Sequence, residues 1–111
     1  MFYLRTSVLK TVREKPGMTF SGPAFSGLCN YVQGVYDSLQ IAAPEHPLYL
    51  ELVGFNDWLA SKFSRVLPSR GWQQIIEELV PDDKERVGEF VRLYLEYREH
   101  LSQTGQTVWS E

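Results

Sequence analysis

The protein has 111 residues, of which 43% are hydrophobic and 14% aromatic, and this is enough to build one buried core in a single domain. Its formal net charge of -3 at pH 7 removes the electrostatic attraction on which nucleic-acid binding depends. No apolar run approaches the roughly 20 residues of a membrane-spanning helix, and a single cysteine excludes an internal disulfide.

These properties predict a cytoplasmic protein with neither a membrane nor a nucleic acid as its partner. The N-terminus lacks an apolar signal core followed by a small-residue cleavage site, and one cysteine fits a reducing compartment. We expect a single helical domain over residues 1–104 and a polar C-terminal tail over 105–111.

The first half of the chain predicts two helices. Apolar residues four apart indicate a helix over 3–14, which Pro16 and Gly17 end. Residues 18–21 form a connector or a short extended segment, because Gly22 and Pro23 interrupt them. A second apolar stripe then predicts a helix over 23–39, with Pro23 in its first turn.

The segment GFNDWLASKF, at residues 54–63, carries three aromatic rings within nine positions. Phe55, Leu59 and Phe63 lie four apart, and Trp58 stands three beyond Phe55, so these side chains share one face of a helix. The stripe begins at Leu48 and predicts a helix over 48–63. We expect its rings to form one wall of the core rather than an open recognition surface.

Two further helices are predicted in the acidic second half. The stripe of Trp72, Ile75, Ile76 and Leu79 indicates a short helix that ends before Pro81. Asp82 resembles the cap of a longer helix over 83–102, because its carboxylate can bind free backbone N–H groups in the first turn. The fold class is therefore all-α, a compact bundle of about five helices.

The candidate chemical groups are few. His46 and His100 belong to no metal-ligand spacing, and Cys29 lies on an apolar stripe, where a buried and unreactive thiol is expected. None of the common nucleophile, phosphate-binding or dinucleotide-binding motifs is present. We therefore predict no catalytic residues, no cofactor and no metal.

Acidic residues crowd the second half. The carboxylates that we assign to a partner-binding surface are Glu77, Glu78, Asp82, Asp83, Glu85, Glu89 and Glu96. On the last helix, acids alternate with Arg92 and Arg98, as they do on an ordinary solvated face. An excess of acid also steers a basic partner, and both interpretations stay open.

A succession of segments resembles a family of small bacterial proteins. The segments are REKPGM, NYVQGVYD, GFNDWLASKF, GWQQIIEEL and EFVRLYLEY, and the likeness extends over residues 4–98. Members of this family resemble immunity proteins of bacterial toxin systems in their size, acidity and lack of catalytic motifs. The resemblance implies an inhibitor that binds a basic toxin domain, and it assigns no functional residues.

Two alternatives use other residues. A small ligand-binding or catalytic bundle would have an aromatic-lined pocket of Trp58, Trp72 and Tyr94, with Asp57 or His100 as its polar group. A helix-turn-helix DNA-binding protein is suggested by the short helices. The basic residues Lys62, Arg65 and Arg70 are the local exception to the acidity that argues against it.

Overall fold

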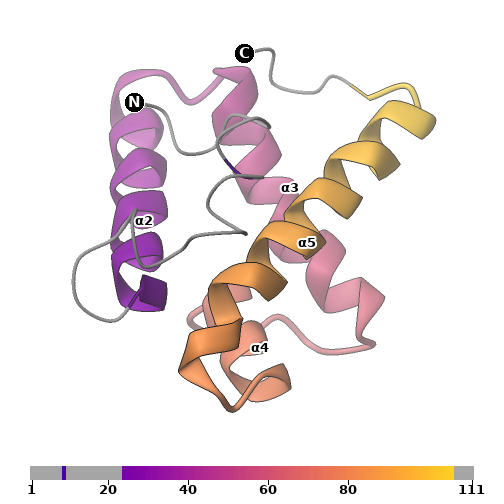
Figure 1. Ribbon diagram of the computed structural model, residues 1–111. Coiled ribbons are helices and arrows are strands. Elements are labelled where there is room, and N and C mark those ends of the chain that lie inside the picture. The colour runs from indigo at the N-terminus through magenta and orange to yellow at the C-terminus, as the bar shows by residue number, and fades with distance from the viewer. Residues whose placement is uncertain (1–8, 10–23, 107–111) are drawn as a thin grey trace.

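The computed structural model describes Leu9 and residues 24–106, and these residues form helices joined by short connections (Figure 1). The helices are α2 (Ala24–Ala42), α3 (Pro47–Lys62), α4 (Trp72–Leu79) and α5 (Asp83–Gln103). None of the described residues forms a strand, so the all-helical class is confirmed over that part of the chain. The helix predicted over 3–14 and the extended segment at 18–21 lie outside it, except for Leu9, which is helical and fully buried.

The predicted helix ranges differ from the observed ones by no more than three residues. The largest difference is in α2, which continues past Leu39 to Ala42. It ends just before Pro44, and the residue that precedes a proline is disfavoured in helical conformation. At the other end of the chain, Gly105 and Gln106 are exposed after α5, and the rest of the predicted tail lies outside the described residues.

Two helices begin with a residue whose side chain caps the first turn. The imidazole Nδ1 of His46 accepts a hydrogen bond of 3.1 Å from the Leu48 backbone N–H, and Pro47 occupies the first turn of α3. A proline fits there because its missing N–H would have no partner in the helix. The carboxylate of Asp82 accepts from the Lys84 N–H at 3.0 Å, which confirms the predicted cap of α5.

The core is built around the ring of Phe55. In Figure 1, α5 crosses the other helices diagonally, and it contacts α2, α3 and α4. The Phe55 ring centroid lies 4.9–6.3 Å from those of Trp58, Trp72, Phe90, Tyr94 and Tyr97. Phe55 is fully buried, so the prediction that GFNDWLASKF forms a core wall is confirmed for that ring, whereas Trp58 and Phe63 are half-buried and pack against the core.

A side chain of α3 caps the neighbouring helix α4. The residue at the start of α4 is Gly71, which has no side chain and a positive φ of 64°. Asn56 replaces the missing cap, because its Oδ1 accepts a hydrogen bond of 2.8 Å from the Trp72 N–H. A Cβ at position 71 would lie 2.5 Å from that oxygen. The contact therefore requires glycine both for its backbone conformation and for its size.

Candidate functional site

The predicted partner-binding acids lie on α4 and along α5. Two of them are neutralised by the connection between α3 and α4. Arg70 donates to Glu77 with a shortest N–O distance of 2.8 Å, and Arg65 pairs with Glu78. The hydrogen bond from Arg70, with a smaller contribution from Gln73, lowers the pKa of Glu77. All three basic residues considered for DNA binding are thus engaged with acids, since Lys62 pairs with Glu96.

Most of the remaining acids have partners as well. Asp82 caps α5, Asp83 pairs with Arg86 at 3.4 Å, and Glu89 pairs with Arg92. Glu96 pairs with both Lys62 and Arg92. Within the described residues, Glu85 is the member of the predicted set whose side chain has neither an ion pair nor a cap.

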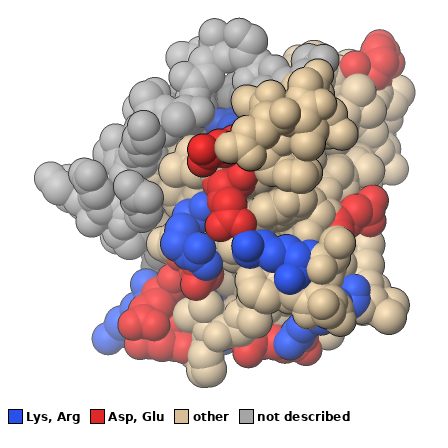
Figure 2. Space-filling view, turned by 90° about the vertical axis from the view of Figure 1, so that its right-hand side faces the viewer, with Lys and Arg blue, Asp and Glu red and all other residues tan. Residues whose placement is uncertain are grey.

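The surface is consequently one of mixed charge. Figure 2 shows acidic and basic side chains alternating over the lower part of one face, with no separate acidic field. Exposed pairs of this kind are worth little stability, about 0–1 kcal/mol each. The role of these acids in partner binding stays a prediction, but the local charge of all of them except Glu85 is already partly compensated.

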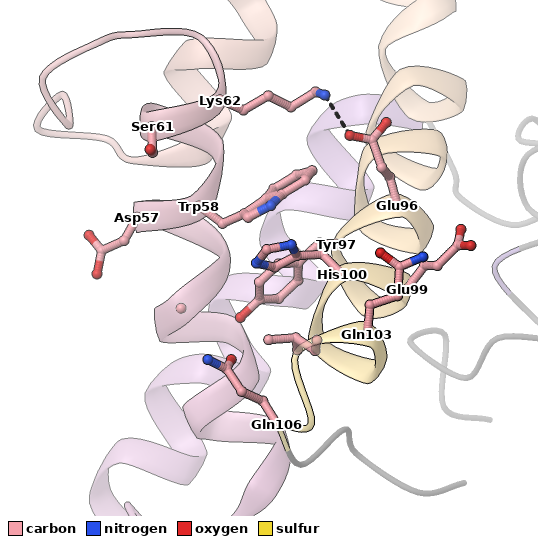
Figure 3. A pocket seen from close by; sticks show the side chains of 12 residues that line it. Asp57, Trp58, Ser61, Lys62, Glu96, Tyr97, Glu99, His100, Gln103 and Gln106 are labelled. Atoms are coloured by element: carbon pink, nitrogen blue, oxygen red, sulfur yellow. Dashed lines mark ion pairs between the residues drawn. The ribbon is translucent and has the colours of Figure 1, made fainter.

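A groove of about 820 Å³ lies on the surface between α3 and α5. Figure 3 shows the rings of Trp58, Tyr97 and His100 between the two helices. The ring centroids of Trp58 and Tyr97 are 5.3 Å apart, and those of Trp58 and His100 are 6.4 Å apart. Trp58 is half-buried, so part of its ring faces the groove while the rest packs on Phe55.

Charged side chains surround these rings. The Nζ of Lys62 lies 5.5 Å from the centroid of the Trp58 ring, and it reaches from α3 to Glu96 on α5 at an N–O distance of 2.5 Å. Asp57 and Glu99 also belong to the lining, but in Figure 3 their carboxylates point away from the space between the helices, Asp57 outward from α3 and Glu99 outward from α5. The lining thus holds three carboxylates against one ammonium group.

A buried ionic network lies beneath the groove. Arg98 of α5 donates to the carboxylate of Glu51 on α3, with a shortest N–O distance of 3.1 Å. The Tyr94 hydroxyl donates to Glu51 Oε2 at 2.6 Å, and the Tyr97 hydroxyl donates to the Glu51 backbone oxygen at 3.0 Å. Tyr97 therefore connects the groove to the network, because its ring lines the groove and its hydroxyl points inward.

The expectation that Arg98 belongs to a solvated face is wrong, since only 6% of it is exposed. Glu51, which is 3% exposed, is absent from the residues predicted for any site. Its position contained a signal: it follows Leu48 by three residues and precedes Phe55 by four. These spacings put it on the apolar face of α3.

Burial also determines the chemistry of Cys29. The thiol is buried, as predicted, and burial raises its pKa to about 12, with the negative charge of Glu77 adding to the effect. Since the thiolate is the reactive form, this side chain is a poor nucleophile at neutral pH.

The aromatic pocket of the alternative function is not formed as predicted. Trp72 and Tyr94 pack with Phe90 in the core, where their centroids lie 4.8 and 5.5 Å from its ring. Trp58 instead lines the groove, together with the two polar groups named for that pocket, Asp57 and His100.

The described residues contain neither a candidate metal site nor a candidate membrane span. No three His, Cys, Asp or Glu side chains gather there as a metal site would require. None of the helices in residues 24–106 combines the length and the apolar character needed to cross a bilayer. No protein-family model, curated protein or solved structure matches the chain significantly.

Proposed function

We propose that this chain is a non-enzymatic binding protein of the immunity kind, which neutralises a basic domain of a protein partner. The observation that carries the proposal is the groove between α3 and α5, in which aromatic rings lie between the two helices and carboxylates lie at its edges. Protein interfaces commonly have this arrangement: a few aromatic anchors supply most of the binding energy, and a polar rim surrounds them.

The open shape of the groove favours a protein segment over a small molecule. Small-molecule pockets enclose most of their ligand, whereas this groove is open to solvent along its length. Eight of its twelve lining residues are polar or charged. A groove that runs between two helices and is walled by charges matches the surface of another protein better.

The net charge favours a basic partner. Residues 24–106 contain twelve Asp and Glu residues against seven Lys and Arg residues. Local ion pairs reduce the field close to each acid, but the excess remains at longer range and speeds the approach of a cationic surface. Binding should therefore slow as salt concentration rises.

The experiment is to express the products of the genes that flank this one, alone and together with this chain, and to follow cell growth. We expect one product to arrest growth alone, and this chain to restore growth and to bind the purified product in calorimetry. The proposal is overturned if no flanking product both arrests growth and binds this chain.

Charge reversal then locates the binding surface. Glu99→Lys on the groove should slow association, whereas Glu45→Lys, an equal change of charge in the exposed connection between α2 and α3, should have a smaller effect. Glu99 is a better probe than Glu89 or Glu96, because both of those acids pair with Arg92 and their reversal would disturb α5.

A second candidate function is a small-ligand site in the same groove, favoured by the proximity of His100 and Asp57 to the Trp58 ring. Screening a fragment library by the NMR signal of the Trp58 indole tests it. A fragment that binds there and leaves the growth-arresting product unbound would favour this function over the immunity function.

A further inference from the structure

We propose that the groove between α3 and α5 receives an extended segment of the protein partner that carries arginine or lysine, and that its cation displaces the Lys62 ammonium group from between Trp58 and Glu96. This inference rests on the proposed function, and it names the chemistry that the groove recognises. In the free protein, Lys62 occupies the place that a cation of the partner takes in the complex.

The position of Lys62 shows that the groove holds a cation. Its Nζ lies 5.5 Å from the Trp58 ring centroid and 5.9 Å from that of Phe63, and it pairs with Glu96. A cation is attracted both to the face of an aromatic ring and to a carboxylate. Trp58 and Glu96 together therefore form a site for one positive charge.

The internal cation is easily exchanged. The side chains of Lys62 and Glu96 are 33% and 39% exposed. A pair with this much contact with water contributes about 1 kcal/mol or less. A partner's guanidinium group would bind this site better than an ammonium group, because it stacks on the indole and forms two hydrogen bonds with a carboxylate.

The dimensions of the groove suit a short extended segment. On the α3 side the lining runs from Gly54 to Lys62, which at 1.5 Å per helical residue is roughly 12 Å. An extended chain advances about 3.3 Å per residue, so about four residues fit along it. The hydroxyl of Ser61 and the amides of Gln103 and Gln106 lie along the same lining, where they can bind the segment's backbone.

The charges of the groove select for a basic segment. Besides Glu96, the lining includes Asp57 on α3 and Glu99 on α5. Once Lys62 has been displaced, the Glu96 carboxylate is left for the incoming cation, while Asp57 and Glu99 lie at the outer edges of the lining (Figure 3). The excess of negative charge attracts arginine and lysine and repels acidic residues.

The test uses two capped tetrapeptides, Ala-Arg-Lys-Ala and Ala-Glu-Glu-Ala, titrated into the full chain and followed by amide NMR shifts. We expect the basic peptide to shift the amides of the groove and the Trp58 indole, and the acidic peptide to leave them unchanged. The proposal is overturned if the two peptides act alike or if the basic peptide shifts only residues elsewhere.

Three variants test the exchange. Lys62→Met removes the competing charge and should tighten binding of the basic peptide by about threefold, and Glu96→Gln should weaken it by about as much. Glu45→Gln, which removes one negative charge outside the groove, should change nothing. Equal affinity in Lys62→Met and the unchanged protein would contradict the exchange.

The results also separate this inference from the proposed function. If a flanking gene product binds the chain but the basic peptide does not bind in the groove, the inferred binding mode is wrong and the proposed immunity function is retained. If the basic peptide binds in the groove as expected but no flanking gene product binds the chain, the proposed immunity function is wrong. Self-association of the chain that the basic peptide reverses would assign the groove to a second copy and overturn the inference.

Discussion

Glu51 and Arg98 carry opposite charges inside the contact between α3 and α5. A buried ion pair is seldom more stable than two apolar residues of similar size, because removing both charges from water costs as much as their attraction returns. Here the pair fixes the position of α5 relative to α3. Hydrogen bonds from Tyr94, Tyr97 and Arg98 all end on Glu51, so α5 is held against α3 at one point along its length.

Removing one partner of this pair should be costly. Arg98→Met leaves the Glu51 carboxylate, which has a fully buried side chain, without its cation, and we expect a loss of about 3–5 kcal/mol of unfolding free energy. Tyr94→Phe removes one hydrogen bond and should cost less, about 1–3 kcal/mol. Urea denaturation measures both, and an Arg98→Met effect no larger than that of Tyr94→Phe would contradict the argument.

The hydroxyl of Tyr97 should make stability depend on alkaline pH. Burial, followed by the charges of Glu51 and Asp57, raises its pKa from the ordinary 10.0 to about 12. Above pH 10 the unfolded chain loses this proton while the folded protein keeps it. The contribution is therefore complete below pH 10 and is lost as the pH rises towards about 12.

Urea unfolding at a series of alkaline pH values checks this expectation. In Tyr97→Phe the decline of stability above pH 10 should be shallower. The remaining slope includes Tyr94, because burial raises its pKa as well. If the decline in the variant were as steep as in the unchanged protein, Tyr97 would not be its source.

At the scale of the helices, Gly54 controls how closely α3 approaches α5. A Cβ built at this position would lie 2.4 Å from the hydroxyl oxygen of Tyr97, closer than a Cβ contact allows. That hydroxyl is fixed by its hydrogen bond to the Glu51 backbone oxygen. The absence of a side chain at position 54 is thus a condition for the packing of both the network and the groove.

Two glycine substitutions form a matched pair. Gly54→Ala should destabilise the protein, because the new methyl group displaces the Tyr97 hydroxyl from its buried bond, at a cost of about 1–3 kcal/mol. A Cβ at Gly88, inside α5, meets no described atom within 4 Å. Gly88→Ala should therefore stabilise the helix by up to about 1 kcal/mol. Thermal unfolding of the two variants should shift in opposite directions, and shifts of the same sign would contradict the close approach.

The helices themselves could be predicted because their signals are local. The stripe that begins at Leu48 and the cap at Asp82 each act within a few residues. Contacts between helices could not be predicted in this way. Asn56 caps a residue 16 positions away, and Glu51 pairs with a residue 47 positions away.

The candidate site was predictable only in part, for the same reason. Trp58, Asp57 and His100 were named, and Glu96 was assigned to the acidic set. Periodicity showed which face each residue takes on its own helix, but not which helix lies opposite. The groove and the bridge from Lys62 to Glu96 depend on how α3 and α5 pack.

At the scale of the whole molecule, α2 to α5 share one continuous hydrophobic core. The ring of Phe55 contacts residues of both α4 and α5, and the Phe25 ring of α2 packs edge-on against Trp72 at 6.2 Å. No described helix buries its apolar face independently of the others, so both walls of the groove rest on the same core.

A shared core predicts cooperative unfolding. Phe55→Ala removes a fully buried ring and should cost about 3–5 kcal/mol, a large part of the stability of a domain of this size. Far-UV circular dichroism reports the helices, and tryptophan fluorescence reports the rings packed on Phe55. Because both depend on the same core, the urea midpoints of the two signals should fall together. Leu50→Ala is the control, because it lies on the same helix but its side chain is 57% exposed. It should lower the free energy of unfolding by no more than about 0.5 kcal/mol, whichever signal is followed.

Midpoints that separate in Phe55→Ala would show instead that the helices and the ring cluster unfold as distinct units. The groove would then lack the common support that its proposed use requires.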